Sequence, residues 1–93
     1  MSTIRTIQAD SETWRVGTYG DRSIEHRAMK LTEEAAEVVK VLTRTAEGRP
    51  AGDMASELGD VFISLCSVAS KAGIDLELAV IERWAQIRER KPA

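Results

Sequence analysis

The stretch that decides the fold consists of two short segments separated by nineteen residues, Lys30-Leu31-Thr32-Glu33-Glu34-Ala35-Ala36-Glu37 and Glu57-Leu58-Gly59-Asp60. Each segment contains a pair of carboxylates three residues apart, Glu34 with Glu37 and Glu57 with Asp60. Residues three apart lie on one face of an α-helix. If both segments are helical, each pair therefore points its two acids to the same side.

The hydrophobic spacing around the first pair predicts a long helix. We expect it to begin after Ser23, a suitable N-cap, and to end near Ala46, with Gly48 and Pro50 as stop signals. Steps of four and three residues define its apolar stripe, which consists of Ile24, Ala28, Leu31, Ala35, Val38 and Leu42. The acid pair of this helix borders that stripe.

The second pair lies in a similar pattern. A helix is expected from Asp53 to Ala72, with Gly73 closing it. Its stripe consists of Met54, Leu58, Val61, Leu65, Val68 and Ala72. Glu57 lies beside this stripe and Asp60 just outside it, with the same offset as the pair on the first helix. Two packed helices with matching offsets would bring the four carboxylates to one place.

The rest of the chain predicts one more helix and little regular structure before residue 20. The last helix is expected from about Asp75 to Arg90, and it is apolar on two sides. Residues 1–20 suggest a short turn-rich segment, with at most a helical turn after Asp10. We therefore predict an all-α bundle of three main helices plus a short N-terminal segment. Because the core of such a bundle is thin, we expect the bundle to be completed by oligomerisation, as a homodimer or homotetramer.

Composition limits the possible functions. The 93 residues are expected to form a single domain, 1–93, and 43% apolar with 30% charged residues indicate a globular chain. A net charge of −2 argues against nucleic-acid and membrane partners. The single Cys66 excludes an internal disulfide. With neither a long apolar span nor a signal-peptide pattern, the default expectation is a cytoplasmic protein.

Two interpretations of the acid pairs are possible. The pairs are either ordinary solvated helix faces or ligands of a metal ion. None of these acids has a Lys or Arg four residues later, the position that best offsets a Glu, and only Lys30 and Lys40 lie within reach. Oxygen ligands select Mg²⁺ or Mn²⁺, and Mg²⁺ usually shares its coordination with substrate phosphates. A di-iron bundle would need Glu-x-x-His pairs, and His26 does not have that spacing.

These segments, followed by the Gly73-Ile74-Asp75-Leu76 turn and a further helix, resemble the MazG-like all-α nucleoside triphosphate pyrophosphohydrolases. The resemblance covers roughly residues 20–90. It implies a helical bundle assembled from two or more chains and Mg²⁺-dependent cleavage of a nucleoside triphosphate between its α- and β-phosphates. The products would be a nucleoside monophosphate and pyrophosphate.

Carried over by position, the resemblance makes Glu34, Glu37, Glu57 and Asp60 the metal ligands and catalytic residues. On the last helix, Arg83 and Arg90 occupy places where the family often has basic residues that contact the substrate. Ile87 occupies the place of an asparagine and cannot supply its hydrogen bonds, so the preferred base and sugar stay open.

Two further substrate contacts are suggested by residue type. Lys30 could meet a phosphate, and Trp14 could stack on a base, although an aromatic side chain in the core or at an interface is the alternative. Two other functions also remain open. One is a module that binds nucleotide and metal without turnover, and the other is a helical dimerisation domain whose acids are only solvated.

Overall fold

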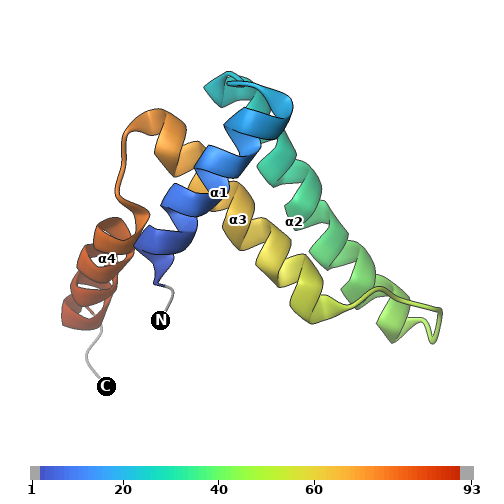
Figure 1. Ribbon diagram of the computed structural model, residues 1–93. Helices are drawn as coiled ribbons and strands as arrows, with labels where there is room; N and C mark the ends of the chain where they lie inside the picture. Colours follow the sequence, from blue (N-terminus) through green and yellow to red (C-terminus); the bar gives the residue numbers. More distant parts are fainter. Residues whose placement is uncertain (1–2, 91–93) are drawn as a thin grey trace.

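The computed structural model describes residues 3–90, which form four α-helices and no strand (Figure 1). They are α1 (Ile4–Tyr19), α2 (Ile24–Ala46), α3 (Met54–Ala72) and α4 (Leu76–Arg90). The predicted all-α class is confirmed, and α2, α3 and α4 match the three helices expected from the sequence. Across these residues no helix is long and apolar enough to cross a membrane.

The predicted helix ends are also present. The Ser23 side chain accepts a hydrogen bond from the His26 amide at 3.1 Å, and Asp53 accepts one from the Ala55 amide at 3.0 Å. Gly73 ends α3 with φ of 71°, a conformation that favours glycine. The next amide, that of Ile74, donates to the Ala69 carbonyl in the last turn of α3 at 2.9 Å.

The prediction for residues 1–20 is wrong, because α1 is a helix of 16 residues. Its N-cap is Thr3, whose hydroxyl accepts a hydrogen bond from the Thr6 amide. The half-buried side chains of α1 are mostly polar, whereas its aromatic residues Trp14 and Tyr19 are exposed. The helix therefore has no apolar stripe for a periodicity argument to find. The cap and the absence of Gly and Pro before residue 17 were the available signals.

Helices α2 and α3 form an antiparallel pair, α1 packs across α3, and α4 packs against α1 (Figure 1). The contact between α1 and α4 is largely polar. The Gln8 side chain donates to the Ile74 carbonyl at 2.8 Å and accepts from the Leu76 amide at 3.0 Å. Arg5 donates to Asp75 at 2.8 Å. The bond from the Leu76 amide satisfies a backbone donor in the first turn of α4, where a helix leaves it without an intrahelical partner.

The core of the described chain is small. Its buried apolar side chains are Val41, Cys66 and Ala69, and two serines of α3 are buried with them. The predicted stripes do not coincide with this core, because seven of their twelve members are more than one-third exposed, namely Ile24, Ala28, Ala35, Leu42, Leu58, Leu65 and Ala72. The α2 face toward α3 instead includes Arg27 and Val41. The small residues of α3 leave room for the Arg27 side chain.

Arg27 connects three parts of the chain. Its side chain is 1% exposed and donates to Glu12 of α1 at 2.6 Å, to Asp21 at 3.1 Å and to the Ser67 carbonyl of α3 at 3.0 Å. Its Nε also donates to the Arg22 carbonyl at 3.0 Å. Hydrogen bonds to Glu12 hold the pKa of Arg27 above its usual value. A buried charge is tolerated when it is paired in this way.

We predict that Arg27→Met, which keeps the aliphatic stem, lowers the free energy of unfolding by about 2–3 kcal/mol because the charge-assisted bonds are lost. Urea unfolding followed by circular dichroism measures this. The control is Lys71→Met, which removes the more exposed partner of Asp21 and should cost less than about 1 kcal/mol. Equal effects of the two substitutions would contradict the role of Arg27.

Candidate metal and nucleotide site

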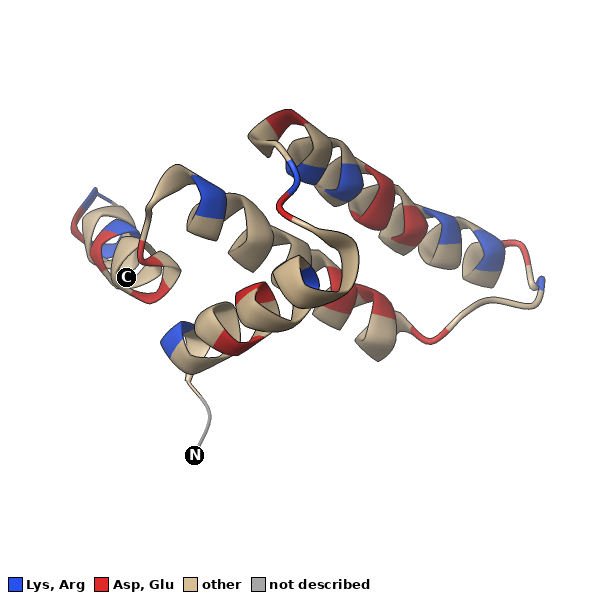
Figure 2. Ribbon diagram, turned by 45° about the horizontal axis from the view of Figure 1, so that its top comes forward, with Lys and Arg blue, Asp and Glu red and all other residues tan. Residues whose placement is uncertain are grey.

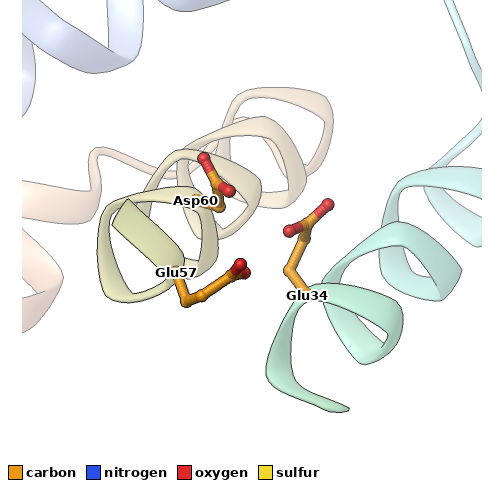
Figure 3. Close-up of side chains that lie close together, drawn as sticks. All are labelled: Glu34, Glu57 and Asp60. Carbon is orange, nitrogen blue, oxygen red and sulfur yellow. The ribbon is translucent and has the colours of Figure 1, made fainter. Parts of the chain in front are cut away.

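Three carboxylates converge between α2 and α3 (Figure 3). Glu34 of α2 and Glu57 and Asp60 of α3 each offer an oxygen, and these oxygens lie within 4.8 Å of one another. The antiparallel pairing of the helices brings the middle of α2 beside the first turns of α3. Spacings of three along α3 place Glu57 and Asp60 on one side of that helix. Figure 2 shows acidic residues in both of these stretches.

The electrostatics of this group favour a cation. Partial burial, followed by the negative charges of Asp60, Glu37 and Glu34, raises the pKa of Glu57 above its usual value. The two lysines nearby in sequence pair with other acids, Lys30 with Glu33 at 3.1 Å and Lys40 with Glu37 at 3.4 Å. A donor set of carboxylate oxygens without a histidine or cysteine suits a hard divalent ion such as Mg²⁺ or Mn²⁺.

Glu37, the fourth predicted ligand, is not in the group that meets within 4.8 Å. It is half-buried, and its carboxylate contacts Lys40. It is nevertheless close enough to Glu57 to contribute to the raised pKa of that residue. Three of the four predicted ligands thus lie together, and the role of Glu37 as a ligand stays a prediction.

A pocket of about 640 Å³ adjoins the carboxylates. Its lining comes from α1, the α1–α2 connection, α2 and α3, and consists of Trp14, Arg15, Tyr19, Arg22, His26, Arg27, Lys30, Glu34, Asp60, Ile63, Ser64 and Ser67. The pocket therefore combines acidic, basic and aromatic side chains. This combination suits a metal-bound polyphosphate that also carries a planar base.

Two of the predicted substrate contacts, Lys30 and Trp14, line this pocket. Trp14 meets Tyr19 edge to face, with ring centroids 5.6 Å apart and planes at 85°. The two rings are 60% and 57% exposed, so neither is a core residue of the described chain. An exposed aromatic pair beside a pocket can stack on a planar ligand.

The other two predicted contacts lie elsewhere. Arg83 lines a separate apolar groove on α4 with Val80, Trp84 and Ile87, and it donates to Gln86 at 3.0 Å. Arg90 is exposed at the end of α4. Within the described chain, neither residue lines the pocket that holds Lys30 and Glu34.

The pocket also contains residues that the sequence did not single out, in particular Arg15 and Arg22. Both belong to the part of the chain in which no helix was expected. Recognition of α1 from the Thr3 cap would have placed Arg15 on the same helix face as Gln8 and Ser11. It would not have placed that face against α3, because polar residues give no burial signal.

The chain also matches a known protein family. Residues 22–93 match the MazG nucleotide pyrophosphohydrolase domain. The chain belongs to this family. The predicted resemblance is thus confirmed, and the family is one of nucleotide pyrophosphohydrolases, the enzyme class that the sequence predicts. The matched residues begin at the α1–α2 connection, so the MazG match includes all three convergent carboxylates but not α1.

A match to a related protein supports the same assignment, and this match also includes residues of α1. The chain is 37% identical over 89 residues to a protein named dATP/dGTP diphosphohydrolase from Salmonella phage PMBT28. The match covers 96% of this chain and 27% of the phage protein. The chain thus spans about a quarter of that relative's length.

We predict that Glu57→Gln weakens binding of Mn²⁺ by more than about tenfold, because one of three convergent oxygens loses its charge. In EDTA, the same substitution should leave the unfolding temperature unchanged or raise it, because it relieves carboxylate repulsion. Calorimetric titration and thermal unfolding measure the two effects. Glu33→Gln is the matched control, since Glu33 faces Lys30 and lies outside the group. Unaltered Mn²⁺ affinity in Glu57→Gln would show that the acids are merely solvated.

Proposed function

We propose that this protein is a Mg²⁺-dependent nucleoside triphosphate pyrophosphohydrolase, with Mn²⁺ as the alternative ion. The observation that carries the proposal is the convergence of Glu34, Glu57 and Asp60 beside a pocket lined by basic and aromatic side chains. Carboxylates alone would suit many divalent-ion sites. Basic and aromatic groups in the same pocket select a ligand that has both phosphates and a planar ring.

The proposed reaction hydrolyses the bond between the α-phosphorus and the oxygen that bridges it to the β-phosphate. Water supplies the new oxygen on the α-phosphorus, and the products are a nucleoside monophosphate and pyrophosphate. Divalent cations bound at the site would neutralise charge on the phosphate oxygens and on the leaving pyrophosphate. Hydrolysis of a phosphoanhydride bond of this type depends mainly on positioning and electrostatic stabilisation.

The residues of the chain supply the positioning. Glu34, Glu57 and Asp60 would hold the ions between α2 and α3, and Glu37 would be the fourth ligand. Lys30 is one helical turn before Glu34 and can meet a phosphate from the same side of α2. Trp14, with Tyr19 packed against it, would stack on the base.

The name of the phage relative suggests the substrates to try first. It refers to dATP and dGTP, and the pocket of this chain has two exposed aromatic rings that suit a purine. We propose purine deoxynucleoside triphosphates as preferred substrates. Loss of an unwanted deoxynucleotide from the nucleotide pool would be the biological result.

We also propose that the active form is a homo-oligomer, a homodimer at least. The accessible surface is 6756 Å², against about 5,300 Å² expected for a compact monomer of this mass. The radius of gyration is 15.5 Å, against about 12 Å. The surplus surface is more than the roughly 800 Å² that each partner buries in a standard interface. Apolar residues of α4 are exposed and suit a second copy, among them Leu78, Val80, Ile81, Trp84 and Ile87.

A screen of the eight common nucleoside and deoxynucleoside triphosphates for pyrophosphate release tests the activity. We expect release with Mg²⁺ and none in EDTA, with dATP or dGTP among the best substrates. Asp60→Asn should lower kcat by about a hundredfold or more while the helical circular dichroism stays unchanged. Glu47→Gln, a charge change at the far end of α2, should retain full activity. Nucleotide binding without any release of pyrophosphate would identify a non-catalytic binding module instead.

Sedimentation equilibrium tests the assembly. The wild-type protein should have at least twice the monomer mass, and Ile81→Glu should shift it to monomer because a buried unpaired charge disfavours the interface. Glu82→Gln, which changes the adjacent exposed residue, should keep the wild-type mass. A monomeric wild-type protein at micromolar concentration would contradict the proposed oligomer.

A further inference from the structure

Arg15 has a buried donor without a partner. The side chain is half-buried on α1, and its Nη1 atom is shielded from solvent and forms no hydrogen bond within residues 3–90. Buried polar atoms in native proteins are nearly always hydrogen-bonded, so such an atom calls for a ligand or another explanation. Arginine has donors only, and its missing partner must therefore be an acceptor.

Arg15 shares a pocket with two residues of the proposed metal site. It lines the pocket that contains Glu34 and Asp60, together with Ile63 of α3. Ile63 follows Asp60 by one helical turn, a rise of about 4.5 Å. Burial raises the pKa of the Cys66 thiol, and the Arg15 charge opposes that increase.

Two other cations of the pocket have acidic partners. Arg27 is held by Glu12 and Asp21, whereas Lys30 pairs with Glu33 in an exposed contact that a phosphate can replace. Within the described residues Arg15 pairs with no carboxylate. Because Arg15 also lines the pocket, its charge acts on an anion that enters there. A phosphate group offers several acceptor oxygens and matches the planar donors of a guanidinium.

We propose that Arg15 binds a phosphate group of the nucleotide. This assignment rests on the proposed function and adds to it a substrate-binding residue on α1. It adds on α1 a substrate contact of the kind that the family resemblance implies for Arg83 and Arg90 of α4. The carboxylates and Arg15 then hold one phosphate chain from two sides, the carboxylates through a cation and Arg15 directly.

Tripolyphosphate with Mg²⁺ is the probe for this contact, because it has the phosphates of the substrate without the base. In calorimetric titration, Arg15→Met should bind it about ten- to a hundredfold more weakly than the wild type. Arg15→Lys should recover part of the loss, since lysine keeps the charge but not the fork geometry. The control is Arg5→Met, on the same helix but in a surface ion pair with Asp75, and it should bind like the wild type.

Stability separates a ligand contact from a structural one. Arg15→Met removes an unpaired buried donor and should keep or raise the unfolding temperature. A lowered unfolding temperature with unchanged affinity for tripolyphosphate would overturn the assignment, as would unchanged affinity alone. A smaller oligomer with unchanged affinity would overturn it too, because the partner of Arg15 would then be an acceptor on a second copy.

The nucleotide assay distinguishes this assignment from the proposed function. Pyrophosphate release by the wild type together with an unaltered KM in Arg15→Met would overturn the role of Arg15 alone. Arg15-dependent binding of tripolyphosphate without pyrophosphate release from any nucleotide would support that role and overturn the proposed hydrolysis.

Discussion

The structure depends on one buried guanidinium. Arg27 of α2 is bonded to Glu12 of α1, to Asp21 in the connection and to the Ser67 carbonyl of α3. An arginine can serve this position because its five donors spread in a plane and its charge is permanent. The same side chain borders the pocket, so the contact that holds the three helices together also shapes the wall of the site.

The small core explains why the site lies where it does. Serine, cysteine and alanine on α3 let α1 and α2 approach that helix closely without a large apolar filling. Acids and bases can then occupy the edges of the same interface, where their ends keep access to solvent. Because these residues are small, the monomer buries little apolar surface. Oligomerisation would supply the missing stabilisation. Catalysis and assembly would in that case use different surfaces, the pocket beside α1 and the exposed face of α4.

Charges are separated along the pocket. The acidic group lies between α2 and α3, whereas the basic and aromatic groups come chiefly from α1, the α1–α2 connection and the start of α2. A substrate with an anionic chain and a planar base can therefore bind through a cation at one end and through direct contacts at the other. Membership of the MazG family and the likeness to the phage diphosphohydrolase are consistent with that arrangement.

The sequence by itself determined the all-α class, the three later helices with their caps, and the acid pairs, because these follow from local spacing and from residues such as Ser23, Asp53 and Gly73. It did not determine α1, since the inward side of that helix is polar and its stability comes from contacts with α3 and α4. Only the tertiary structure decided that Arg15, Trp14 and Lys30 share a pocket with Glu34 and Asp60 while Arg83 does not. Such proximity is set by helix packing between distant segments, which periodicity along one helix cannot specify.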